Sequence, residues 1–78
     1  MIAELDTVVL QRDFPEHSLK QGDIGAVVHC YQNGAAYEVE FVTAEGKTVA
    51  LLTLTASDIR PMADTEILHA RKLTESAT

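Results

Sequence analysis

The most regular alternation of hydrophobic and polar positions lies between residues 37 and 41. Tyr37, Val39 and Phe41 alternate with Glu38 and Glu40, which separates an apolar face from an acidic one. A period of two residues is typical of a β-strand that buries one face and exposes the other. The sequence therefore predicts a strand here, with its two glutamates toward solvent.

Four further apolar stretches predict strands over residues 7–11, 25–31, 48–54 and 59–62. Their β-branched residues and the turn residues between them favour strands over helices. The pattern within 7–11 does not decide which of its faces is buried. The stretch 48–54 is apolar on both sides, so we expect it to be central in the sheet or covered by another segment. Pro61 lacks an amide hydrogen, which restricts the last strand to an edge or makes Pro61 its final residue.

Short turns connect the middle strands. Asn33-Gly34 between two apolar stretches is a strong hairpin signal, because both residue types tolerate positive φ. Residues 43–47 predict a second tight connection, and residues 55–58 predict a single helical turn before the last strand. Neighbouring strands joined by such short connections are expected to pair antiparallel.

A long connection separates the first two predicted strands. Residues 12–22 have no hydrophobic period, and we expect Phe14 and Leu19 to fold back and close one end of the core. The connection ends in Gly22-Asp23-Ile24-Gly25, where two glycines flank an aspartate before an apolar strand begins. A turn of this composition is typical of small SH3-like barrels.

Together these elements predict an all-β fold, a small five-stranded SH3-like barrel over residues 1–62. An open antiparallel meander is the alternative. Residues 63–78 differ in character and form a C-terminal tail, partly helical or disordered. Ile67, Leu68 and Leu73 occur at helical offsets, so we expect a short amphipathic helix with a frayed end.

Composition and charge narrow the classes of function. A chain of 78 residues holds one domain. Its 12 acidic and 6 basic side chains give a net charge of −6, which disfavours nucleic acid and anionic membranes and suits a basic protein partner. The acidic N-terminus is unlike a secretory signal, and no apolar run approaches the roughly 20 residues of a membrane helix. We expect a cytoplasmic protein with Cys30 as a reduced thiol.

The sequence resembles a small bacterial family catalogued as domain of unknown function 4926. The resembling segments keep the family's order between residues 4 and 62: Glu4–Leu10, Phe14–His17 with Leu19-Lys20, Gly22–Gly25, Tyr37–Val42 and Ala56–Pro61. The resemblance supplies no catalytic residues, because the family is uncharacterised. It implies a gene that lies beside a second small gene, as in toxin–antitoxin or immunity pairs. More distantly, the turn and barrel are similar to KOW domains and to the barrel of nitrile hydratase β subunits.

The long loop offers the first candidate chemistry. His17 lies next to Glu16 and near Asp13, an arrangement that could supply a general base with an orienting carboxylate. A solvated loop histidine is the favoured interpretation, since exposed His–Glu neighbours are common. Asp13, Glu16 and Asp23 could also hold a hard cation, but their spacing does not follow an EF-hand. We therefore expect solvated loop carboxylates.

The strands offer two more candidate pairs. His29 and Cys30 are adjacent, so they should point to opposite faces and cannot share a catalytic centre. Glu38 and Glu40 should lie about 7 Å apart on one face, a separation that suits paired carboxylates in glycoside hydrolysis. Alternation along a half-exposed strand produces such pairs by default, however. A solvated acidic face is the favoured interpretation.

No zinc spacing, nucleophile elbow or dinucleotide fingerprint occurs, and we expect no catalytic residue, metal or cofactor. The sequence favours a non-enzymatic protein-binding module, the antitoxin or immunity-type partner of a neighbouring gene product. Accessory-subunit and KOW-like nucleic-acid-binding roles are the alternatives, the latter disfavoured by charge. Strand edges could also support a homodimer. The residues expected to contact a basic partner are Asp13, Glu16, His17, Glu38 and Glu40.

Overall fold

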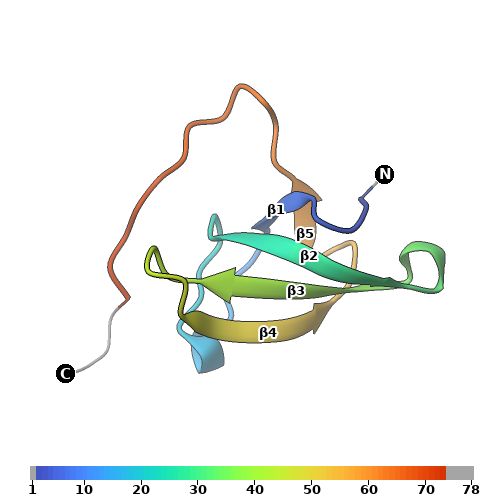
Figure 1. Ribbon diagram of the computed structural model, residues 1–78, viewed down its shortest axis with the longest axis horizontal. Helices are drawn as coiled ribbons and strands as arrows, with labels where there is room; N and C mark the ends of the chain where they lie inside the picture. The colour runs from blue at the N-terminus through green and yellow to red at the C-terminus, as the bar shows by residue number, and fades with distance from the viewer. Residues whose placement is uncertain (1, 74–78) are drawn as a thin grey trace.

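The computed structural model describes residues 2–73 and shows an all-β fold (Figure 1). Its strands are β1 (Thr7–Leu10), β2 (Ile24–Tyr31), β3 (Ala36–Val42), β4 (Thr48–Leu54) and β5 (Ile59–Pro61). Two short 3-10 helices, η1 (Pro15–His17) and η2 (Gln32–Gly34), lie in the connections. The strands form one antiparallel sheet in the order β4-β3-β2-β1-β5. The predicted five-stranded all-β class is confirmed. Within residues 2–73 no helix is long and apolar enough to cross a membrane.

The alternation in β3 sets the two faces of the sheet. Tyr37, Val39 and Phe41 are buried, and Val39 is completely inaccessible. β3 pairs with β2 on one side and β4 on the other, so its outward residues lie in the middle of a three-stranded surface. Glu38 and Glu40 are half-buried on that surface. The predicted strand and its orientation are confirmed.

The core collects inward residues from all five strands and from the first loop. Phe14 and Leu19, which face each other across an isolated β-bridge, are buried as predicted and close one end of the core. The guanidinium of Arg12 lies 4.0 Å from the centroid of the Phe14 ring and covers its outer side. The largest completely buried side chains all come from the strands: Val8, Leu10, Val27, Val39 and Ile59.

Gly25 allows β2 to pass close to the side chains of β3. A Cβ at this position would lie 2.7 Å from Val39 Cγ1 and 2.7 Å from Phe41 Cε2, shorter than any normal contact between carbon atoms. Because both neighbours are buried, the missing side chain of Gly25 is part of the packing of the core.

The position of β4 differs from the prediction. It pairs only with β3 and ends the strand order, so the expectation of a central or covered strand is wrong. Its inward residues Ala50 and Leu54 pack in the core, whereas Leu51 is 53% exposed on the other face. Val9 and Val27 are buried and add nothing to the exposed surface.

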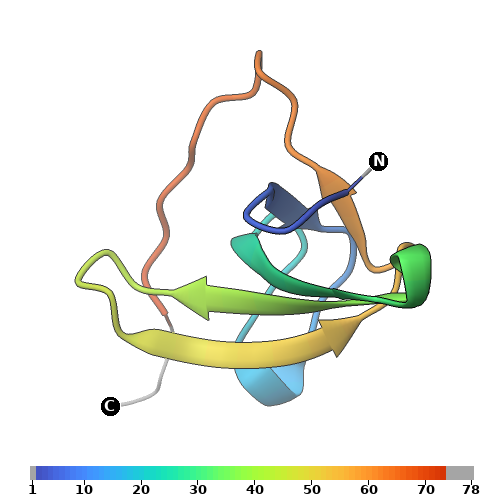
Figure 2. The same cartoon turned by 45° about the vertical axis from the view of Figure 1, so that its right-hand side comes forward.

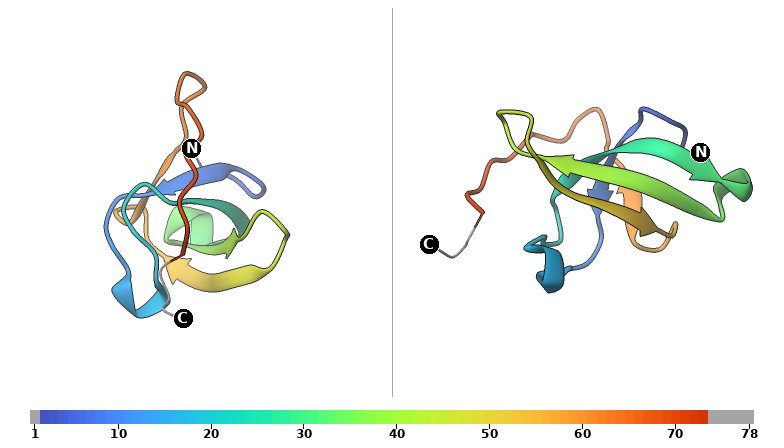
Figure 3. Two further views of the ribbon diagram at one scale, coloured as in Figure 1. Left: turned by 90° about the vertical axis from the view of Figure 1, so that its left-hand side faces the viewer. Right: turned by 60° about the horizontal axis from the view of Figure 1, so that its bottom comes forward.

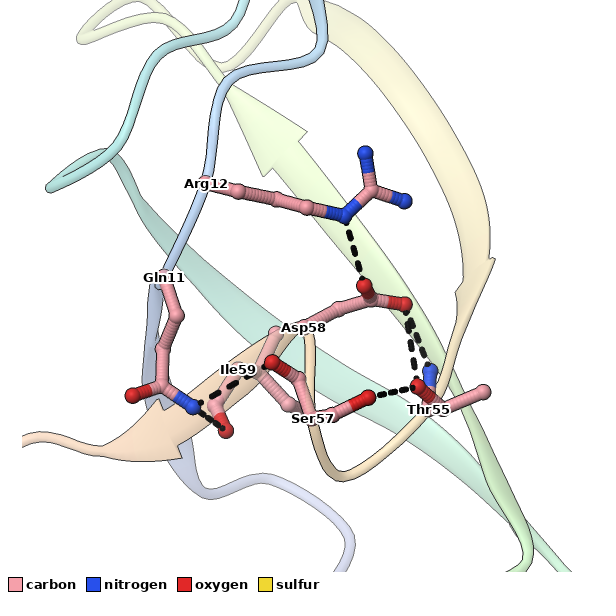
Figure 4. Close-up of polar contacts among 6 residues, drawn as sticks. All are labelled: Gln11, Arg12, Thr55, Ser57, Asp58 and Ile59. Carbon is pink, nitrogen blue, oxygen red and sulfur yellow. Dashed lines mark hydrogen bonds and ion pairs between the residues drawn. The ribbon is translucent and has the colours of Figure 1, made fainter.

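The connection between β4 and β5 is a hydrogen-bonded turn in place of the predicted helical one (Figure 4). The Asp58 amide donates to the Thr55 carbonyl oxygen at 2.9 Å. The Asp58 carboxylate accepts hydrogen bonds from the Thr55 amide at 3.0 Å and from Arg12 Nε at 2.8 Å. Gln11 Nε2 donates to the Ile59 carbonyl oxygen at 2.9 Å. These contacts attach the first loop to the turn.

The tail, residues 63–73 as far as the structure describes it, is not helical. It leaves β5, arches outward and returns beside the start of β2 (Figure 2). Ile67 is 88% and Leu68 is 73% exposed, so the predicted apolar face has nothing to pack against. A short helix is marginal in water without such packing. The helix prediction is therefore wrong for residues 63–73, and its remainder, residues 74–78, lies outside the described chain.

Candidate protein-binding surface

The outward face of β2, β3 and β4 carries both of the strand glutamates. Glu38 lies between His29 of β2 and Thr53 of β4, and Glu40 lies between Ala26 and Leu51. Successive rows across an antiparallel sheet bring such side chains within reach of one another. The acidic residues of β3 are therefore flanked by a histidine, a threonine and apolar side chains.

Hydrogen bonds fix the direction of the Glu38 carboxylate. Its Oε1 accepts one from the Thr53 hydroxyl at 2.7 Å and one from the Tyr31 hydroxyl at 3.1 Å. The hydrogen bond to Glu38 raises the pKa of Tyr31 above its ordinary value of 10.0. The phenol therefore stays neutral and continues to donate at physiological pH.

Glu40 is held in a similar way one row further along the sheet. Its Oε2 accepts a hydrogen bond from the Thr48 hydroxyl at 2.7 Å. No basic side chain of the described residues forms an ion pair with either Glu38 or Glu40.

Apolar side chains border these carboxylates. Leu51 is 53% exposed next to Glu40, and Tyr31 is 39% exposed beside Glu38. We call Tyr31, Glu38, Glu40 and Leu51 the outer patch. It combines fixed negative charge with an aromatic and an aliphatic contact. Tyrosine is enriched at the centres of protein interfaces, whereas carboxylates are typical of their polar rim.

The predicted loop residues lie elsewhere. Asp13 accepts a hydrogen bond from the Gln21 amide at 2.8 Å, so its carboxylate stabilises the loop. Glu16 and His17 are exposed on η1. The loop carrying η1 projects away from the middle of β3 in both views of Figure 3. The structure thus groups the five predicted contact residues into two surfaces, with Glu38 and Glu40 on one of them.

His29 and Cys30 point in opposite directions, as their adjacency predicts. Cys30 packs against the core, whereas His29 stays exposed on the outward face. His29 Nδ1 lies 3.4 Å from Glu4 Oε2, and its ring meets the Tyr31 ring edge-on at a centroid distance of 4.5 Å. Among the described residues no group of three or more histidine, cysteine or carboxylate side chains is arranged to hold a metal ion.

The predicted contact residues did not include Tyr31 or Leu51. Tyr31 could have been found from its position opposite Ala36, on the outward side of the hairpin. Leu51 carried no usable signal, because an edge strand and a central strand can have the same apolar composition. Its exposure depends on the order of the strands in the sheet.

A second surface feature joins the tail to the barrel. Arg71 Nε donates to Asp23 Oδ1 at 2.8 Å, and its Nη2 donates to Asp23 Oδ2 at 2.5 Å. Nη2 also lies 2.9 Å from the Ser18 carbonyl oxygen. Burial alone would raise the pKa of Asp23, but the hydrogen bonds from Arg71 and from the Lys20 amide outweigh it and lower that pKa.

A second arginine holds the beginning of the tail. Arg60 on β5 donates to both carboxylate oxygens of Glu66, at 2.8 and 2.6 Å, and the Ala63 amide donates to Glu66 Oε1 at 2.7 Å. The hydrogen bond from Arg60 and then that from Ala63 lower the pKa of Glu66 from 4.5 to about 2. Glu66 is therefore ionised at any physiological pH.

Comparison with known proteins gives one match. A family model described as Domain of unknown function (DUF4926) matches residues 4–61, which include all five strands. No curated protein matches the chain, and no solved structure matches it. The matched span includes the outer patch and ends before the tail.

Proposed function

We propose that this chain, which belongs to the DUF4926 family, is a non-enzymatic module that binds another protein through the outer patch. The observation that carries the proposal is the exposure of Leu51 and Tyr31 beside two carboxylates that have no ion-pair partner within residues 2–73. Such a surface suits a partner that presents arginine or lysine side chains around an apolar centre.

The two parts of the patch contribute differently to binding. The net charge of −6 and the carboxylates of Glu38 and Glu40 attract a basic surface and accelerate its encounter. The apolar area of Tyr31 and Leu51 is removed from water in the complex, which slows dissociation. Because hydroxyl groups already orient both carboxylates, little side-chain freedom is lost on binding.

We further propose that the partner is the product of a neighbouring gene, for which this chain acts as an antitoxin or immunity-type protein in the cytoplasm. The small size and acidic charge of the chain support this, because such a protein can cover a basic partner with a single face. Co-expression tests it: the wild-type chain should relieve any growth defect caused by the neighbouring product.

Affinity capture from the native host tests the binding surface. The tagged wild-type chain should retain a partner that the double variant Glu38→Lys/Glu40→Lys loses. The variant Glu45→Lys is the matched control for the single variant Glu38→Lys, because both change the net charge by two units and Glu45 is exposed in the turn after β3, away from the patch. Leu51→Ser should shorten the lifetime of the complex with little effect on its association rate.

The purified pair then tests the electrostatic part of the mechanism. Binding of the wild-type chain should weaken as salt rises, and the double variant should lose much of that salt dependence. Equal affinity of wild type and double variant at low salt would falsify the outer-patch proposal. Equal loss in Glu45→Lys would show that only net charge matters, and would also overturn it.

A further inference from the structure

After β5 the tail returns to the start of β2, where Arg71 holds it. Arg71 meets Asp23 with two parallel hydrogen bonds, and the same guanidinium donates to the Ser18 carbonyl oxygen. The Arg71 and Asp23 side chains are 24% and 17% exposed. Lysine could not reproduce this planar, two-pronged contact. The site at the start of β2 is thus shaped to receive an arginine.

Beneath the tail lies an apolar hollow. It has a volume of about 500 Å³. We call it the Asp23 groove; its barrel side includes Asp23, Leu19, Ile24, Val42 and Val49, and its other side is tail residues 69–73. Ala70 is too small to occupy much of this space. Leu73 belongs to the lining but is itself 37% exposed, and Ile67 and Leu68 are not part of the lining.

The Arg71 ion pair and Leu73 therefore hold the tail, while part of the apolar lining of the groove stays uncovered. A bound segment with the same arginine and a larger apolar neighbour would keep the contacts to Asp23 and Ser18 and also bury the lining of the groove. Each additional buried CH₂ group favours such a complex. A segment with a larger apolar side chain beside its arginine should therefore bind the groove more tightly than the tail does.

We propose that the Asp23 groove is a recognition site for an arginine-containing segment of a partner protein, which displaces the chain's own tail. The segment is extended, carries one arginine for Asp23 and places an apolar side chain next to it. The acidic barrel attracts such a basic segment, and removal of Arg71 leaves the Asp23 carboxylate free to receive it. This site is separate from the outer patch, and the proposal does not depend on it.

Because the tail competes for the groove, releasing it should tighten the binding of an added peptide by a measurable factor. A tethered segment this short has an effective concentration of about 1 mM. A peptide with an intrinsic Kd of about 0.1 mM would therefore bind about tenfold more weakly to the wild-type chain than to a chain whose tail is released.

The experiment uses the full chain and a fluorescein-labelled synthetic peptide with the sequence of residues 66–73. Fluorescence anisotropy should show about tenfold tighter binding to Arg71→Ala than to wild type. Lys72→Ala is the matched control, because Lys72 is exposed and adjacent, and it should bind like wild type. Adding Asp23→Asn to Arg71→Ala should abolish the gain.

Changes in the peptide test its chemistry. Lysine in place of the arginine should weaken binding, and leucine in place of the alanine before the arginine should strengthen it by filling the groove. Equal binding of all three peptides would overturn the proposal. Loss of peptide binding in Glu38→Lys/Glu40→Lys instead of Asp23→Asn would also overturn it and would assign the peptide to the outer patch.

Nuclear magnetic resonance gives a readout that does not require any variant to fold. Saturating the wild-type chain with the leucine-containing peptide should shift the amide signals of Asp23 and Ile24, and should move those of residues 69–73 toward random-coil positions. Tail signals that stay unchanged while the peptide binds would contradict displacement. A stable wild-type dimer that exchanges tails, detected by light scattering, would also contradict it, because the tail would then not compete within one chain.

Discussion

Arg71 and Asp23 are separated by 48 positions in the sequence, yet their side chains form two parallel hydrogen bonds of 2.8 and 2.5 Å. This ion pair fastens the tail to the start of β2 and lies at one end of the Asp23 groove. Between β5 and this ion pair the tail is not helical, because Ile67 and Leu68 have no apolar surface to pack against.

The ion pair between Arg60 and Glu66 predicts an unusual acid titration. The pKa of Glu66 is about 2 in the folded protein, below the 4.5 of an unperturbed glutamate. A lowered folded-state pKa stabilises the protein above pH 4.5, and this stabilisation is lost as the pH falls toward 2. The carboxyl carbon signal of Glu66 should therefore titrate near pH 2 in the wild-type chain.

The variant Arg60→Gln provides the control for this titration. Without the guanidinium, the midpoint for Glu66 should rise toward 4.5, although the Ala63 amide still lowers it somewhat. A wild-type midpoint at 4.5 would show that the pair does not persist in solution.

Asp58 should matter for stability more than an ordinary surface aspartate. Its carboxylate caps the turn before β5 through Thr55 and holds Arg12 of the first loop. Asp58→Ala should lower the free energy of unfolding by about 1–3 kcal/mol, which corresponds to about 4–8 °C in Tm for each kcal/mol. Asp64→Ala, at an exposed tail position, should change it by less than about 0.5 kcal/mol. Equal effects of the two variants in thermal unfolding would contradict the capping role.

The close approach of Gly25 to Val39 predicts that substitutions at these two positions have coupled effects on stability. Gly25→Ala should cost about 1–3 kcal/mol, because the new methyl group overlaps Val39 and Phe41. Val39→Ala should relieve part of this clash, so the double variant should be more stable than the sum of the single effects by about 1 kcal/mol. Urea unfolding of the four chains in the cycle measures the difference.

Gly22 offers the control for this cycle. A Cβ there has no neighbour within 4 Å, although its φ of +95° makes alanine unfavourable for the backbone. Gly22→Ala and Val39→Ala should therefore be additive within about 0.5 kcal/mol. Additivity in the Gly25 cycle as well would mean that β2 and β3 move apart freely.

Tyr31 reports on the geometry of the outer patch. Because the Glu38 hydrogen bond raises its pKa, the Tyr31 phenol should lose its proton above pH 10.0, and Glu38→Gln should bring the transition down. A raised folded-state pKa means that the associated stabilisation is present below pH 10.0 and is lost as the pH rises through the folded value. The ζ-carbon signal of Tyr31 measures the transition, and an unchanged midpoint in Glu38→Gln would show that the two side chains do not interact.

The local pattern of apolar and polar residues was sufficient to predict the strands and much of the core. The alternation around Val39 identifies a strand and its buried face, since a period of two has only one simple structural interpretation. Phe14 and Leu19 are large apolar residues in an otherwise polar loop, which predicts their burial. Glu38 and Glu40 follow from the same alternation and are the part of the candidate surface that the sequence identifies.

The sequence by itself determined the all-β class, the strands and the acidic outward side of β3, because each depends on neighbouring residues and on a fixed period. Tertiary structure alone decided that β4 lies at the edge, which exposes Leu51 beside Glu40. It also decided that Arg71 pairs with Asp23, so that the tail is a non-helical segment held against the start of β2. Contacts between distant residues have no local signature, since many pairings satisfy the same hydrophobic pattern and only packing of the whole chain selects one.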